Sequence, residues 1–178
     1  TARELVSGTL ESELKGIVLE RDEVTLDRFD QIVEECPVLD IEETMEVDEF
    51  FDLAGQKLAE RMDEDSDRIS KALKEREKDG STVLTPNLAV PHIVIDGDHE
   101  FEVLLARCRD GVRFSEEAQE VKAVFVLVGT KDERNFYLNA LSAIAQVAGH
   151  MEFMDRWMNA RGPQGLRDVV VLGKRSRS

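Results

Sequence analysis

The sequence predicts an α/β protein in which a mixed central β-sheet is flanked by helices, as an α/β/α sandwich. Three observations predict this class. Apolar residues recur at helical spacing in roughly the first 80 positions, strand-like apolar runs separated by turn residues follow, and helical spacing returns from about residue 133. Helices and strands do not alternate as in regular βαβ units, which favours a mixed sheet. The 178 residues suffice for one domain with a substantial core.

The first part of the chain is expected to be mostly helical. The expected helices cover residues 3–20, 26–35, 48–62 and a segment from Asp63–Ser66 to Gly80. Pro37 ends the second of these helices because the residue before a proline avoids helical geometry, and Val38–Ile41 follows as a candidate strand. Gly80 ends the fourth, since glycine is the usual residue just after a helix.

Strands are expected in the middle of the chain, separated by turns at Pro86-Asn87, Asp96-Gly97 and Asp110-Gly111. The expected strands are 82–84, 89–90, 93–95, 101–107 and 121–128. The last is the most apolar and is expected to be buried on both faces. Helices should follow over about 133–147 and 151–160, after which Gly162-Pro163 breaks the helix and Val169–Leu172 forms either a strand or a helix end.

Charge and cysteine content exclude several classes of protein. The net charge is −15, and residues 1–80 carry 25 acidic and 11 basic side chains, which disfavours nucleic acid as a partner. We favour a solvated helical surface as the reason for this acidity; a salt-adapted source and a basic partner are the alternatives. Cys36 and Cys108 are interpreted as reduced, buried thiols, with a single disulfide as the less favoured alternative. The histidine and cysteine spacing predicts no metal site. The sequence has no GxGxxG or Walker motif, and no cofactor is expected.

The expected organisation is a helical extension at residues 1–45, a main domain at 46–173 and a disordered tail at 174–178. No apolar run approaches the roughly 20 residues of a membrane span, and no signal peptide is evident. The chain begins at Thr1 rather than at methionine, which suggests a fragment of a longer protein. The expected location is therefore cytoplasmic, either free or as the cytosolic domain of an integral membrane protein.

The most informative motif is Pro91-His92, at the end of a segment that starts with the turn Gly80-Ser81-Thr82 and follows Arg76. This order predicts one imidazole at a sheet edge, among hydroxyl, backbone N–H and guanidinium donors. A neutral imidazole with one anchored ring nitrogen is a nucleophile, and the surrounding donors suit a phosphoryl group. His92 is the candidate acceptor, and Arg76, Ser81 and Thr82 are candidate phosphate-binding residues. Taken alone, the motif would be explained better by a strand-end histidine with a structural hydrogen bond.

Three ordered blocks resemble the type-2 (fructose/mannitol-type) enzyme IIA domain of the bacterial sugar phosphotransferase system. They are Arg76–Thr82 with Leu88–His92, Gly111–Phe114 leading into the apolar strand, and Asn135–Ala145. The resemblance covers about residues 47–173 and implies a mannitol-type enzyme IIA fold. It also implies that His92 receives a phosphoryl group from a histidine of a phosphocarrier protein.

The resemblance is incomplete at Tyr137. In the family a second histidine stands at this place and faces the phosphorylated one. A tyrosine can still donate a hydrogen bond, which makes Tyr137 a further candidate phosphate-binding residue, but it brings no titratable positive charge near pH 7. Ile93 and Thr85-Pro86-Asn87 stand where the family commonly has glycines around the active loop. These departures weaken the case for an efficient relay.

Three functions are carried forward. The favoured one is a regulatory phospho-acceptor domain attached to a membrane transporter, since domains of this type occur as cytoplasmic tails of cation/proton antiporters and amino-acid permeases. The alternatives are an active phosphocarrier in sugar uptake, which would make the chain a phosphotransferase, and a degenerate binding or oligomerisation domain without phosphochemistry. The expected partners are a phosphocarrier protein or a transporter domain, with a homodimer left open. Any contact with a membrane would run through the parent transporter.

Overall fold

The computed structural model describes residues 13–19, which are helical, and residues 25–177. The helices are α2 (Arg28–Glu35), α3 (Val47–Ala59), α4 (Ser66–Asp79), α5 (Arg134–Ala148), α6 (Phe153–Asn159) and α7 (Gly162–Val171), with a short 3-10 helix at Lys131–Glu133. The strands are β1 (Val38–Ile41), β2 (Met45–Glu46), β3 (Val83–Thr85), β4 (Leu88–Ala89), β5 (His92–Ile95), β6 (Phe101–Arg113) and β7 (Val121–Thr130). Most of the helix expected at residues 3–20 lies outside the described residues.

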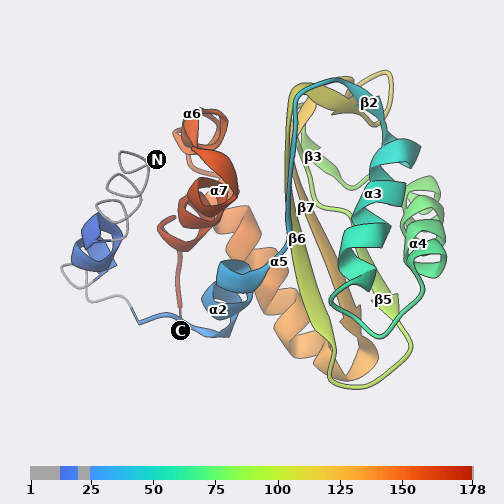
Figure 1. Cartoon of the computed structure of the whole chain (residues 1–178), viewed down its shortest axis with the longest axis horizontal. Coiled ribbons are helices and arrows are strands. Elements are labelled where there is room, and N and C mark those ends of the chain that lie inside the picture. Colours follow the sequence, from blue (N-terminus) through green and yellow to red (C-terminus); the bar gives the residue numbers. More distant parts are fainter. Residues whose placement is uncertain (1–12, 20–24, 178) are drawn as a thin grey trace, which may run out of the picture.

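A single mixed sheet forms the centre of the molecule (Figure 1). Its main order is β1-β6-β7-β4-β3, while β2 also pairs with β6 and β5 also pairs with β7. The β6–β7 and β3–β4 pairs are antiparallel, and the other pairs are parallel. The predicted α/β class with a mixed sheet is confirmed.

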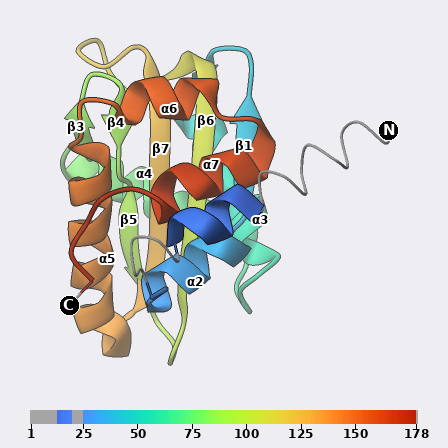
Figure 2. The ribbon, with the colours of Figure 1, turned by 90° about the vertical axis from the view of Figure 1, so that its left-hand side faces the viewer.

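Different helices cover the two faces of this sheet. Helices α3 and α4 lie on one face, and α2, α5, α6 and α7 lie on the other (Figures 1 and 2). The alternation of side chains along β6 separates two cores: Val103 and Leu105 pack with the α5 side, whereas Leu104 and Ala106 pack with the α3 side. Strand β7 is buried on both faces except at Lys122, as its apolar run predicts.

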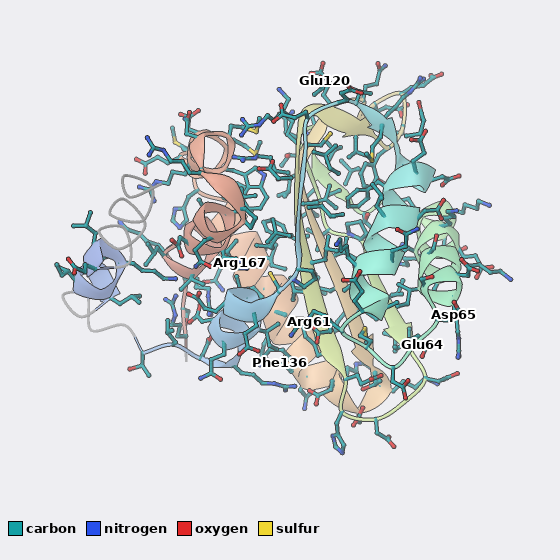
Figure 3. The ribbon with its side chains drawn as sticks, in the orientation of Figure 1. Arg61, Glu64, Asp65, Glu120, Phe136 and Arg167 are labelled. Carbon is teal, nitrogen blue, oxygen red and sulfur yellow. The ribbon has the colours of Figure 1, made fainter. Side chains whose placement is uncertain are left out.

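The segment Val169–Leu172, expected to be either a strand or a helix end, is a helix end: α7 begins at Gly162, whose φ of 65° suits glycine, has a proline in its first turn and ends at Val171. One expectation about local structure was wrong. Asp110-Gly111 does not end the strand before it. Gly111 has a φ of 93° and lies against the backbone of Glu120, so β6 passes through an irregularity there and runs on to Arg113 (Glu120 is labelled in Figure 3).

Side-chain caps fix the starts of two helices. Asp27 and Asp30 form a reciprocal capping box at the start of α2. Asp65, at the start of α4 in Figure 3, accepts a hydrogen bond from the backbone N–H of Asp67. The cap of α4 matters for function because the other end of this helix leads into the Gly80 turn.

The structure does not separate residues 28–45, assigned above to the extension, from the main domain. Strand β1 pairs in parallel with β6, and α2 contributes Phe29, Val33 and Cys36 to one of the two cores. The tail beyond residue 173, expected to be disordered, contacts α2 as far as Arg177. Within the described residues, no helix has both the length and the apolar character needed to cross a membrane.

Candidate phosphoryl-acceptor site

His92 is the first residue of β5, immediately after a break between β4 and β5. Strands β4 and β5 both run alongside β7, and Val90-Pro91 interrupts them. The half-buried ring of His92 places Nδ1 2.7 Å from the carbonyl oxygen of Val90. A carbonyl oxygen can only accept, so Nδ1 carries the proton, and in a neutral ring Nε2 carries the lone pair. The local geometry therefore leaves Nε2 as the nucleophilic atom.

Tyr137, in the first turn of α5, stands over the His92 ring. The two ring centroids are 6.0 Å apart at 65°, and the Tyr137 ring also meets Phe101 edge to face at 5.7 Å. Gly129 on β7 makes room for this packing, because a Cβ there would lie 3.0 Å from the Tyr137 ring. The Tyr137 hydroxyl is buried and has no hydrogen-bond partner among the described residues. A buried donor without a partner is uncommon, and the ring contact with His92 makes this hydroxyl a candidate to bind a group held at His92.

Arg76 supplies positive charge to this region from the last turn of α4. Its Nη1 donates to the carbonyl oxygen of Gly80 at 2.9 Å, which also caps the helix end. Burial raises the pKa of the Tyr137 hydroxyl well above its usual value, and the charge of Arg76 opposes that rise. Tyr137 is therefore protonated near neutral pH and is available as a donor.

The two hydroxyl residues predicted for this site have different surroundings. Ser81 is exposed, and its Oγ accepts a hydrogen bond from the N–H of Val83 at 3.1 Å. Thr82 is buried, and both its N–H and its hydroxyl donate to the carboxylate of Glu77, at 2.9 and 2.5 Å. The Thr82 hydroxyl is thus engaged within the protein, whereas the Ser81 hydroxyl can still donate its proton outward.

The sequence analysis did not single out Glu77. One signal was available, because an acidic side chain in the last turn of a helix is unfavourable for the helix dipole unless something else holds it. That partner is Thr82, five residues later and immediately before β3. The carbonyl of Val90 was also not foreseen as the specific anchor of His92.

A second cluster of potential ligands lies apart from this site. In the part of the chain that the structure describes, His99, Asp132 and Glu133 bring ligand atoms within 4.8 Å of one another. The carboxylate of Asp132 already contacts the backbone N–H and the ring nitrogen Nδ1 of His99. The carboxylate of Glu133 forms an ion pair with Arg28 at 2.7 Å. Nothing in the donor set requires an ion, and this cluster carries no argument for a metal.

The arrangement around His92 can be compared with known proteins. The family model described as "Phosphoenolpyruvate-dependent sugar phosphotransferase system, EIIA 2" matches residues 35–171. A comparison with curated proteins gives no match.

Among solved structures, the nitrogen regulatory protein IIA-Ntr from Neisseria meningitidis is similar with a TM-score of 0.72 and 23% identity, over 81% of this chain and 99% of that one. The enzyme IIA mannitol of Escherichia coli gives a TM-score of 0.61 and 16% identity, over 82% and 99%. A complex of that enzyme IIA with phosphorylated enzyme IIB gives a TM-score of 0.59 and 16% identity, over 82% and 96%. At these identities the likeness establishes the fold.

Proposed function

The chain belongs to the EIIA 2 family of the phosphoenolpyruvate-dependent sugar phosphotransferase system, and from that premise we propose that it is a phospho-acceptor domain that regulates a membrane transporter. His92 is the acceptor in this proposal, and the parent transporter is of the cation/proton antiporter or amino-acid permease type, with this domain on its cytosolic side. One observation carries the assignment of the acceptor: the hydrogen bond between Nδ1 of His92 and the Val90 carbonyl.

The proposed reaction is a transfer between two nitrogen atoms. The lone pair on Nε2 of His92 forms a new P–N bond as the P–N bond of a phosphohistidine on the phosphocarrier protein breaks, and the donor nitrogen regains its lone pair. The proton stays on Nδ1, hydrogen-bonded to the Val90 carbonyl oxygen, throughout. Such a transfer depends on positioning and charge stabilisation. Arg76 offers a guanidinium, and Ser81 and Tyr137 offer hydroxyl donors, for the incoming phosphoryl oxygens.

Tyr137 favours a regulatory role for this domain over a role as a rapid phosphocarrier. By the resemblance described in the sequence analysis, it stands at the place of the family's second histidine, and it adds a neutral donor in place of a group that can become positively charged near pH 7. The phosphoryl group would therefore be held with less charge compensation, and its transfer would be slower. Slow transfer suits a domain that reports the phosphorylation state of the phosphocarrier better than one that passes phosphate on rapidly.

Labelling tests the proposed acceptor. We expect phosphoenolpyruvate, enzyme I and the phosphocarrier protein to label the chain on Nε2 of His92, giving an acid-labile mark identified by mass spectrometry and by NMR. His92→Gln should lose the label, and the matched variants His99→Gln and His150→Gln should keep it. A genuine enzyme IIA in the same reaction is the positive control. If the label lies on His99 or His150, the acceptor assignment is wrong. If only the positive control is labelled, the degenerate binding domain becomes the better description.

The parent reading frame tests the attachment to a transporter. We expect the gene to encode membrane-spanning segments in frame with this domain. A complete reading frame that encodes this domain without any membrane span would contradict the tethered arrangement.

Tyr137→Phe should separate stability from function. Removing an unsatisfied buried hydroxyl should raise the free energy of unfolding by about 1 kcal/mol, since its desolvation is no longer uncompensated. The same change should slow labelling of His92 about fivefold, as expected for the loss of one hydrogen bond of about 1 kcal/mol to the transferred group. Urea denaturation and the initial labelling rate measure the two effects. An unchanged labelling rate would remove Tyr137 from the proposed site, and faster labelling of Tyr137→His would confirm that the tyrosine limits transfer.

A further inference from the structure

A continuous series of hydrogen bonds joins the end of α4 to the ring of His92. The carboxylate of Glu77 accepts from the backbone N–H and the hydroxyl of Thr82, at 2.9 and 2.5 Å. The carbonyl oxygen of Thr82 then accepts from the N–H of Val90 at 3.0 Å. The carbonyl oxygen of Val90, in turn, lies 2.7 Å from Nδ1 of His92. Thr82 and Val90 are both buried, so these contacts are shielded from competing water.

The segment that anchors His92 has little other support from the sheet. Val90-Pro91 lies in the gap between β4 and β5, and Pro91 has no N–H to donate. The carbonyl oxygen of Pro91 bonds the N–H of Leu127 on β7, whereas the N–H of Val90 bonds Thr82 on the opposite side. The position of Val90 therefore depends on Thr82, and that of Thr82 depends on Glu77.

We propose that Glu77 is a positioning residue for the phosphoryl acceptor, because it fixes Thr82 and Val90 so that the Val90 carbonyl holds the proton of His92 on Nδ1. This inference rests on the proposed function of His92. Histidine in water prefers the tautomer with the proton on Nε2, which would block the nucleophilic nitrogen. The series of contacts that starts at Glu77 keeps Nε2 open instead.

Electrostatics alone predicts the opposite effect of removing Glu77. Loss of a negative charge near the site should help an anionic phosphoryl group to approach, and labelling should become faster. Loss of positioning should make labelling slower. The sign of the change in rate therefore distinguishes the two explanations.

The test compares three substitutions at Glu77 with one control. In Glu77→Ala we expect labelling about tenfold slower, and the ring nitrogen NMR signals of His92 should move from the Nδ1–H form to a mixture of tautomers. Glu77→Gln removes the same charge but keeps an acceptor for Thr82, so it should restore the Nδ1–H form and most of the rate. Glu77→Asp keeps the charge but cannot reach both donors of Thr82, so it should show the slower rate and the mixture even if the alanine variant fails to fold. Glu75→Ala, an exposed acid in the same part of α4, should behave as wild type.

The tautomer measurement needs no phosphorylation and therefore separates the two proposals. If wild type is not labelled but the tautomer changes in Glu77→Ala and Glu77→Asp, the proposed function fails and the positioning role of Glu77 stands. If wild type is labelled and His92 keeps its Nδ1–H form in both variants, the positioning role is overturned. Faster labelling of Glu77→Ala would overturn it as well.

Discussion

Replacing Arg107 with methionine should lower the free energy of unfolding by about 2–4 kcal/mol, because a buried carbonyl group and a carboxylate lose their charged hydrogen-bond donor. The Arg107 side chain is completely buried within β6. Its Nε and Nη2 donate to both carboxylate oxygens of Asp40 on β1, at 2.9 and 2.7 Å. Its Nη1 donates to the carbonyl oxygens of Trp157 and Ala160 at the end of α6, at 2.9 and 2.7 Å. Methionine fills the space but removes the donor from the Asp40 carboxylate and from the Ala160 carbonyl, whereas the Trp157 carbonyl keeps the N–H of Ala160.

Urea denaturation of Arg107→Met and of the matched variant Arg109→Met measures this effect. Arg109 lies two residues further along β6, and its pair with Glu42 is more exposed, so its loss should cost about 1 kcal/mol or less. A cost for Arg107→Met no greater than that for Arg109→Met would contradict the structural role assigned to Arg107.

The effect of Arg107→Met should depend on pH in a defined direction. Hydrogen bonds from Arg107 lower the pKa of Asp40 in the folded protein. A carboxyl group with a lowered folded pKa stabilises the fold above its unfolded pKa of about 3.9, and this contribution is lost as the pH falls through the folded value. The difference in free energy of unfolding between wild type and Arg107→Met should therefore be largest near neutral pH and should decrease below about pH 4.

Local sequence signals predicted the parts of this fold that depend on neighbouring residues. Each of these signals can be recognised in a short stretch of sequence. They are the apolar run of β7, the proline and glycine that end helices, and the Pro91-His92 motif. Gly111 was interpreted wrongly because glycine suits both a turn and a strand irregularity, and only the approach of Glu120 decides between them.

The partners of buried polar groups could not be predicted in the same way. Arg107 contacts Asp40, from which it is separated by 67 residues, and it also contacts the end of α6. The spacing of apolar residues in the sequence cannot predict such contacts. Glu77 is closer to Thr82 in sequence, but its role emerges only when Val90 and His92 are placed beside Thr82. The candidate acceptor was therefore visible in the sequence, whereas the network that orients it was not.

Removing the carboxylate of Asp30 should be about as costly as removing Arg107, and it should also release the C-terminal tail. Asp30 is fully buried in the first turn of α2. Its two oxygens accept from Arg175 at 3.0 Å and from Arg177 at 2.9 Å, and one of them also accepts from the N–H of Asp27. Arg175 also binds the carboxylate of Asp27 at 2.7 Å, and its side chain is only 3% exposed. In Asp30→Ala, the guanidinium groups of Arg175 and Arg177 each lose a carboxylate acceptor. We therefore expect the free energy of unfolding to fall by about 3–5 kcal/mol.

Limited proteolysis adds a readout that a general loss of stability would not give. In wild type the contacts of Arg175 and Arg177 with α2 should slow trypsin cleavage after Lys174 and Arg175, because a protease needs an extended, detached segment. In Asp30→Ala, cleavage there should become fast under conditions in which the rest of the domain stays intact. Gln31→Ala, at the next and exposed position of α2, should change the free energy of unfolding by no more than about 0.5 kcal/mol and leave the tail protected. If the tail of Asp30→Ala is cleaved no faster than that of Gln31→Ala, Asp30 does not hold it, and the order of residues 174–177 must come from their other contacts with α5 and α7, through Gln146 and Val171.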